Sequence, residues 1–165
     1  MSVGDSVRKA VEGITTRMAA NWDSVRDLVE APAGVDLQSL IGGAERLKYE
    51  AAEDFGGERL LPRLYVIVEG SVEIDDFLTP ARDLSVPLLL RLVHREHGAE
   101  TVEDYSWGYA EILRRLLNEH GEEWANDKIW RIVLEDLAVD AHGDDRYRRQ
   151  VELRATVKVR TDRTL

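Results

Sequence analysis

Apolar side chains near the start of the chain recur every three or four positions. Over residues 3–29 they fall on one stripe, at Val3, Val7, Val11, Ile14, Met18, Trp22, Val25 and Val29. This spacing predicts a long amphipathic helix with one buried side. Ser2 or Asp5 can cap its start, and Pro32 disfavours helical geometry in the residue before it, so the helix should end near residue 30. Gly13 weakens its middle, where a kink or break is an alternative.

Near the other end of the chain, apolar and polar positions alternate without a break. Between residues 146 and 161 the apolar face carries Val151, Leu153, Ala155, Val157 and Val159. The opposite face carries Gln150, Glu152, Arg154, Thr156, Lys158 and Arg160. A period of two predicts a β-strand with one buried face. Full burial of each larger apolar member contributes about 1.5–3 kcal/mol, so a one-residue slip that exposes the whole face is strongly disfavoured.

Three further strands are predicted between these two elements. Residues 63–75, RLYVIVEGSVEID, alternate side chains between two faces and predict a first strand, for which a bend at Gly70 is an alternative. Residues 84–96 predict a second strand, with Pro87 near its start or on a sheet edge because proline cannot donate to a ladder. Residues 129–140 predict a third strand, and residues 141–144 predict the tip of the hairpin that leads into the last strand.

A second helix is predicted over residues 101–120. Its apolar stripe contains Val102, Tyr105, Tyr109, Ile112, Leu113, Leu116 and Leu117. Thr101 and Asp104 resemble a capping box at its start, and Gly121 suits the left-handed residue after its end. Residues 33–60 fit either a helix or an extended arm that becomes ordered on a neighbouring subunit, because glycine pairs bracket a weakly apolar segment there.

The order of these elements predicts an α+β fold in a single domain over residues 1–165. An N-terminal helix (1–30) and an uncertain segment (31–60) precede a ββαββ core (61–165). This order gives an antiparallel four-stranded sheet with helices packed on one face. A chain of 165 residues, 44% hydrophobic and 33% charged, is typical of one globular domain.

Composition excludes several kinds of chemistry and of location. The chain has no cysteine, so disulfides, thiolate nucleophiles and cysteine-based zinc sites are excluded. Its N-terminal segment lacks the apolar core of a signal peptide, and no apolar run approaches the ~20 residues that span a bilayer. We therefore expect a protein that is made and kept in the cytoplasm, with no membrane partner.

Charge is distributed unevenly along the chain. The net charge is −10, but residues 146–165 contain seven basic and two acidic side chains, a net charge of +5 that leaves −15 on the rest. An acidic body disfavours sequence-specific binding to nucleic acid, and a basic strip beside it favours self-association or a charged protein partner. A solvated surface is the alternative. Arg154, Lys158 and Arg160, on the polar face of the last strand, are therefore the candidate subunit interface.

Few residues in the chain have a spacing that suggests chemistry. His94 and His97 are close enough in sequence to suggest a metal site, but three residues apart on a strand point to opposite faces, so we interpret both as structural or surface side chains. The acidic pairs Asp75-Asp76, Glu122-Glu123 and Asp144-Asp145 are interpreted as turn formers, and the tryptophans as core or interface side chains. Phosphate-cradling and nucleophile-elbow motifs are absent. We predict no catalytic residue, no cofactor and no metal.

The element order resembles that of a known family. An N-terminal helix, the proline-led strand LPRLYVIVEG, a second strand after an acidic connector, a helix of about twenty residues and a closing long hairpin look like the tail terminator proteins of long-tailed bacteriophages. The layout is also similar to the related head-tail joining and tail completion proteins. The resemblance covers residues 60–161 and, more loosely, the first helix, while residues 31–59 are longer than the family pattern requires.

The resemblance implies a structural, non-enzymatic virion protein without cofactor. Such proteins form a homo-oligomeric ring, commonly a hexamer, that caps the tail tube and joins it to the head connector. Its partners would be the tail tube protein and the head-connector protein, first in the host cytoplasm and then in the tail or neck of the virion. Two alternatives remain open: a small α+β ligand- or metal-binding enzyme that uses His94, Glu96 and His97, or a dimeric adaptor that pairs its last strand across a two-fold axis.

Overall fold

The structure, a computed structural model, describes residues 2–41, 44–46, 60–76, 81–96, 98–118, 128–141, 143 and 146–162. The helices are α1 (Val3–Leu28) and α2 (Ala99–Asn118). The strands are β1 (Ala44–Arg46), β2 (Leu60–Val68), β3 (Glu73–Asp76), β4 (Ala81–Arg95), β5 (Ile129–Ala141) and β6 (Arg148–Asp162). The predicted α+β class is confirmed, with six strands in the sheet where four were predicted.

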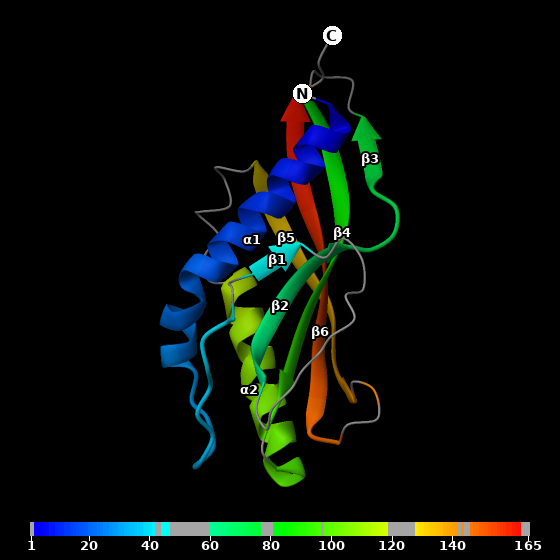
Figure 1. The fold of residues 1–165 in the computed structure, drawn as a ribbon. Helices are drawn as coiled ribbons and strands as arrows, with labels where there is room; N and C mark the ends of the chain where they lie inside the picture. Colours follow the sequence, from blue (N-terminus) through cyan, green and yellow to red (C-terminus); the bar gives the residue numbers. More distant parts are fainter. Residues whose placement is uncertain are drawn as a thin grey trace.

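The strands form one sheet in the order β1-β2-β4-β6-β5, and β3 pairs with β4 beyond the end of β2 (Figure 1). Every pairing is antiparallel except that of β1 with β2. Strands β4 and β6 are paired along their whole length and form the centre of the sheet. At the end of the sheet where β6 finishes, β3 lies on one side and the start of β5 on the other (Figure 1).

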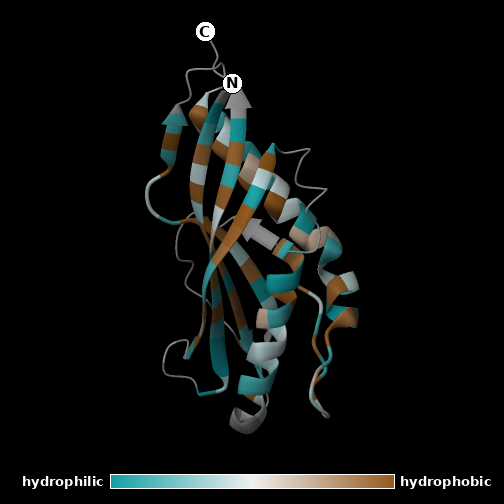
Figure 2. Ribbon diagram, turned by 180° about the vertical axis from the view of Figure 1, so that it is seen from behind, coloured by the Kyte–Doolittle hydropathy of each residue, from teal (hydrophilic) through white to brown (hydrophobic). Residues whose placement is uncertain are grey.

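Both helices pack on one face of the sheet, as predicted. The five apolar side chains of β6 that face them are all buried, at 0–3% exposure. They join one core with Leu84, Val86, Leu88, Leu90 and Leu92 of β4 and with the apolar stripes of α1 and α2. Brown and teal bands alternate along the strands in Figure 2, as expected when one face is apolar and the other polar.

Helix α1 begins and ends close to its predicted limits. Ser2 is its N-cap, and the Ser2 hydroxyl accepts a hydrogen bond from the backbone N–H of Asp5 at 3.1 Å. The helix is continuous over 26 residues, so the break considered at Gly13 is absent. Its predicted stripe is buried from Val11 to Val25. The spacing of apolar residues therefore predicted this helix correctly.

Helix α2 begins two residues before its predicted start. Its first backbone hydrogen bond runs from the N–H of Val102 to the carbonyl of Gly98 at 3.2 Å. The Thr101 hydroxyl also donates to the Gly98 carbonyl, so Thr101 lies inside the helix and the predicted capping box is wrong. The predicted apolar stripe is buried throughout. Gly121 lies outside the described residues.

The segment after α1, residues 29–41, contains no helix and crosses from α1 to the sheet; we call it the strap. Backbone N–H groups of Asp36 and Gln38 donate to the hydroxyls of Tyr105 and Tyr109 on α2 at 3.0 and 3.2 Å. Trp22 of α1 donates to the Gln38 carbonyl at 2.9 Å. Farther on, the three residues of β1, Ala44–Arg46, pair with β2. Because they are part of the sheet, the helix alternative is wrong for them. Residues 47–59 lie outside the described residues.

Pro87 lies in the middle of central strand β4, so its predicted place at a strand start or sheet edge is wrong. The Pro87 carbonyl accepts from the N–H of Glu69 at 2.9 Å, so the polar groups of Pro87 point toward β2 and β3. There β2 ends at Val68 and β3 begins only at Glu73, after Gly70 with a positive φ of 95°. The missing N–H of proline thus falls at a break in the neighbouring ladder.

Candidate functional site

His94 lies at the end of β4 and points into the core rather than to solvent. Its side chain is 0% exposed and lies edge-on to the Tyr109 ring, with 5.0 Å between ring centres. Its Nε2 lies 2.8 Å from Ser106 Oγ on α2, and its Nδ1 lies 3.3 Å from Glu96 Oε1. Of the two roles expected for His94, the structure assigns the structural one. His97 lies outside the described residues.

The order Ser106–His94–Glu96 resembles a nucleophile, a base and an orienting carboxylate. In a catalytic triad the serine hydroxyl donates its hydrogen to the histidine. Here the Ser106 hydroxyl donates its single hydrogen to the Val102 carbonyl at 2.7 Å instead. Nε2 must then supply the hydrogen of its contact with Ser106, so it is a donor and not a base. All three residues are at most 1% exposed. The cluster therefore connects β4 to α2 and offers no nucleophile to a substrate.

The described residues contain no group of three His, Asp or Glu side chains placed to hold a metal ion. Among the acidic pairs, only the side chain of Asp75 is described, and it is exposed. Asp75 and Asp76 lie on strand β3, so the turn-former interpretation is wrong for this pair. Glu122, Glu123, Asp144 and Asp145 lie outside the described parts of the chain. In those described parts, no helix combines the length and apolar character needed to cross a membrane.

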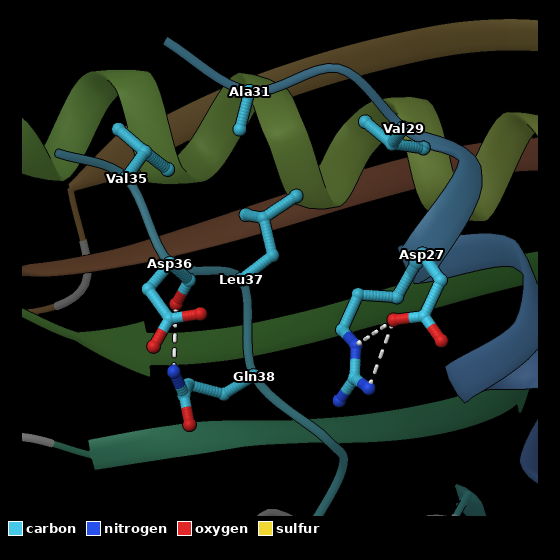
Figure 3. Close-up of a pocket in the computed structure, with 8 residues that line it drawn as sticks. Asp27, Val29, Ala31, Val35, Asp36, Leu37 and Gln38 are labelled. Carbon is cyan, nitrogen blue, oxygen red and sulfur yellow. Dashed lines mark hydrogen bonds and ion pairs between the residues drawn. The ribbon is translucent and has the colours of Figure 1, made fainter. Parts of the chain in front are cut away.

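A hollow of about 290 Å³ lies between the end of α1 and the strap (Figure 3). Its polar side chains bond to their neighbours: Arg26 to Asp27 at 3.1 Å and to Ser39 at 2.6 Å, and Gln38 to the Asp36 carbonyl at 2.7 Å. The guanidinium and the amide thus already hold partners from their own chain. This hollow has the geometry of a surface groove beside a loop.

Arg154 lies at the centre of the face of the sheet opposite α1 and α2. We call this the charged face, defined by Glu69, Asp83, Ser85, Arg91, Asp136, Glu152, Arg154, Lys158 and Arg160. Arg154 contacts Glu69 at 3.2 Å, Asp136 at 3.5 Å and Glu152 at 3.8 Å. Desolvation opposes its charge, but the hydrogen bond to Glu69 and the three carboxylates outweigh it and raise the pKa of Arg154.

Lys158 and Arg160 also have partners within their own chain. The Lys158 ammonium donates to Ser85 at 2.6 Å, and Arg160 bonds Asp83 at 3.0 Å. The hydrogen bond to Asp83 raises the pKa of Arg160. Arg160 also lies over the ring of Trp130, 5.3 Å from its centre. The predicted interface residues thus share one face with Arg154, but both arginines already have carboxylate partners. Whether they contact a neighbouring subunit stays a prediction.

The two edges of the sheet at the end where β6 finishes carry opposite charge. On one side, the acidic edge consists of Glu73, Ile74 and Asp75 of β3. On the other side, the basic edge consists of Lys128, Trp130 and Arg131 at the start of β5. All six residues are exposed, with Ile74 at 51% and Trp130 at 50%. The Glu73, Asp75, Lys128 and Arg131 side chains bond to no described residue, unlike those of the charged face.

Sequence reasoning missed these edges because strand order decides which strands are outermost. From the sequence, residues 73–75 are the end of the strand predicted over 63–75, and residues 129–131 are the start of the strand predicted over 129–140. The signal available was a pair of like charges in each segment: Glu73 and Asp75 flank one apolar residue, and Lys128 and Arg131 flank two.

The three tryptophans within the described residues fall into different environments. Trp22 is buried in the core, as predicted, and Trp124 lies outside the described residues. Trp107, on the outer side of α2, is 53% exposed, and Trp130 is half exposed at the basic edge. Core packing is therefore confirmed for Trp22 and wrong for Trp107 and Trp130. An exposed tryptophan is compatible with the interface role that was the other expectation.

No protein-family model matches the chain, and no curated protein matches it either.

Proposed function

We propose that this protein is a structural subunit of a bacteriophage virion, of the tail terminator or head-tail joining kind. In this role, copies form a ring that caps the tail tube and presents a surface to the head connector. The ring would assemble in the host cytoplasm and remain in the tail or neck of the virion. Its partners would be copies of itself, the tail tube protein and the head-connector protein.

The observation that carries this proposal is the pair of unlike edges on one sheet. A ring needs two different, mutually complementary patches on each subunit, because each copy contacts its two neighbours through different surfaces. Glu73 and Asp75 on one edge and Lys128 and Arg131 on the other supply such patches, and they lie at the same end of the sheet. The element order that motivated the resemblance adds support.

A structural role fits the interior better than a catalytic one. The cluster most similar to a catalytic group, Ser106–His94–Glu96, is buried, and its hydrogen bonds run opposite to those of a general base. On the charged face, Arg154 and Arg160 contact carboxylates and Lys158 donates to Ser85, which is an arrangement suited to packing and register. We therefore propose no reaction and no cofactor.

Native mass spectrometry and negative-stain electron microscopy would test the proposal. The protein is examined over a range of concentrations, alone and with the tail tube protein of the same genome. We expect closed rings of one size, or rings that form at the end of tubes. A chain that stays monomeric even with tubes present would contradict the proposal, and a strictly two-fold dimer would favour the adaptor alternative instead.

A further inference from the structure

We infer that neighbouring copies join through their sheets, with the acidic edge of one copy against the basic edge of the next. The interface would be an antiparallel pairing of β3 with β5 of the second copy. This inference rests on the proposed ring, and it deepens that proposal by naming the two surfaces that meet. The occupant of each edge is thus a second copy of this chain.

Strand directions within the sheet agree with this pairing. Strands β3 and β6 run one way, and β4 and β5 run the other, because successive neighbours are antiparallel. Rotation about a ring axis keeps every copy in the same orientation relative to that axis. Strand β5 of the next copy then runs opposite to β3, which gives the antiparallel ladder that is the commoner type.

The lengths of the two edges also match. Strand β3 has four residues. Strand β5 has irregularities between Ile129 and Arg131 and between Leu134 and Asp136, so it is regular over residues 131–134. A four-residue strand can therefore pair with the regular stretch without meeting either bulge, which would otherwise interrupt the ladder.

The faces of the sheet select one register. Asp75 and Glu73 lie on the charged face because they pair with Asp83 and Ser85, and Arg131 lies there because it pairs with Lys158. Placing Asp75 opposite Arg131 puts an acid against a base on that face. The same register places Ile74 opposite Ile132 of the next copy, on the helix-covered face. It therefore covers a side chain that is half exposed in the single chain.

Charge explains why unlike edges would meet rather than like ones. Any exposed strand edge can pair through its backbone, so side chains must decide which edge it accepts. Pairing β3 with β3 would oppose carboxylates, and pairing β5 with β5 through its basic end would oppose cations. Like charges across an interface disfavour these alternatives. The charged side chains of both edges, which bond to no described residue, thus favour a head-to-tail ring over a two-fold dimer.

Charge reversal tests the pairing. Variant A carries Glu73→Lys and Asp75→Lys, so both of its edges are basic. Variant B carries Lys128→Asp and Arg131→Glu, so both are acidic; aspartate is chosen because residue 128 has a φ of 61°, which aspartate tolerates. Each variant alone should assemble about 100-fold more weakly than the wild-type protein. An equimolar mixture of A and B should assemble again, and so should one chain that carries all four changes.

A matched control separates this effect from a change in net charge. Glu30→Lys with Asp104→Lys shifts the net charge as variant A does, at exposed positions away from both edges, and should assemble like the wild-type protein. Thermal unfolding followed by circular dichroism checks that every variant folds. If wild-type protein forms rings and variants A and B form them equally well, the edge pairing is wrong and the ring proposal stands.

Other outcomes separate the two proposals further. If A and B restore each other but the products are open fibres without affinity for tail tubes, the edge pairing stands and the proposed function is wrong. A wild-type protein that never associates overturns both. The absence of cysteine gives a second measurement: Asp75→Cys with Arg131→Cys should give a ladder of disulfide-linked oligomers on oxidation, whereas a mixture of the two single variants should stop at dimers.

Discussion

The two faces of β6 are built from alternating residues of one strand but behave differently. Toward the helices, five apolar side chains are buried at 0–3% exposure. On the charged face, Arg154 contacts three carboxylates and Arg160 contacts Asp83. The first face stabilises the fold by removing apolar surface from water, and this contribution is large and depends on how well the side chains fit together. The second consists of ion pairs that are partly exposed, and such pairs contribute little each.

This difference changes the meaning of the basic strip. The sequence places a net charge of +5 on residues 146–165, but Arg154 and Arg160 already contact carboxylates on β4, on β5 and at Glu69 just after β2. Replacing Arg154, Lys158 and Arg160 with glutamate would put a new carboxylate at position 154 beside the three that Arg154 now contacts. The monomer would be destabilised along with any assembly. The two edges, whose charged side chains have no partner among the described residues, therefore give a cleaner test of association.

The largest expected effect comes from truncating the helix-covered face. Leu153→Ala should lower the free energy of unfolding by about 2–5 kcal/mol, because it leaves a cavity in a core where Leu153 is 3% exposed. Urea unfolding followed by tryptophan fluorescence measures it. Thr156→Ala, on the charged face of the same strand, is the matched control and should change stability by much less. Equal losses at the two positions would contradict the division between the faces.

The next effect concerns the buried contact between β4 and α2. Ser106→Ala should cost about 1–3 kcal/mol, because it leaves the Nε2–H of His94 buried without an acceptor. Thr15→Ala is the control, since the Thr15 hydroxyl makes the same bond to a carbonyl four residues back, at 2.7 Å, without a histidine partner. We expect the control to lie within about 0.5 kcal/mol of the wild type. A loss at Thr15 as large as at Ser106 would mean that His94 adds nothing.

Local patterns predicted the elements, but the pairings of distant segments could not be predicted. The stripe of α1 and the alternation of β6 each depend on one face being buried, and both were read correctly. Pro87 was misplaced because its tolerance in a central strand depends on a break in a neighbouring strand after Val68. The burial of His94 depends on Ser106, twelve residues later, folding over it. Which charged residues lie on an edge of the sheet likewise depends on the order of the strands, and local residue spacing does not reveal that order.

A smaller effect is expected on the charged face itself. Arg154→Ala should lower the free energy of unfolding by about 1 kcal/mol or less, because the side chain is 37% exposed and its ion pairs are screened by solvent. Chemical denaturation at low and high salt measures it, and the loss should shrink at high salt. Arg154→Met is the control that keeps most of the aliphatic packing. A loss above that of Leu153→Ala would reverse the ranking of the two faces.

The smallest effect lies on the outer side of α2, where Glu111 bonds Arg114 at 2.6 Å and Arg115 at 2.9 Å. The Arg114 hydrogen bond lowers the pKa of Glu111 from 4.5 to about 2. The stabilisation from the Glu111 carboxylate is therefore complete above the pKa of Glu111 in the unfolded chain. It is lost as the pH falls toward the pKa of Glu111 in the folded protein. Glu111→Gln should be less stable than the wild type by about 0.5 kcal/mol at neutral pH. Urea unfolding should show this difference vanishing near pH 2, and a difference that does not change with pH would mean that packing, rather than charge, connects these side chains.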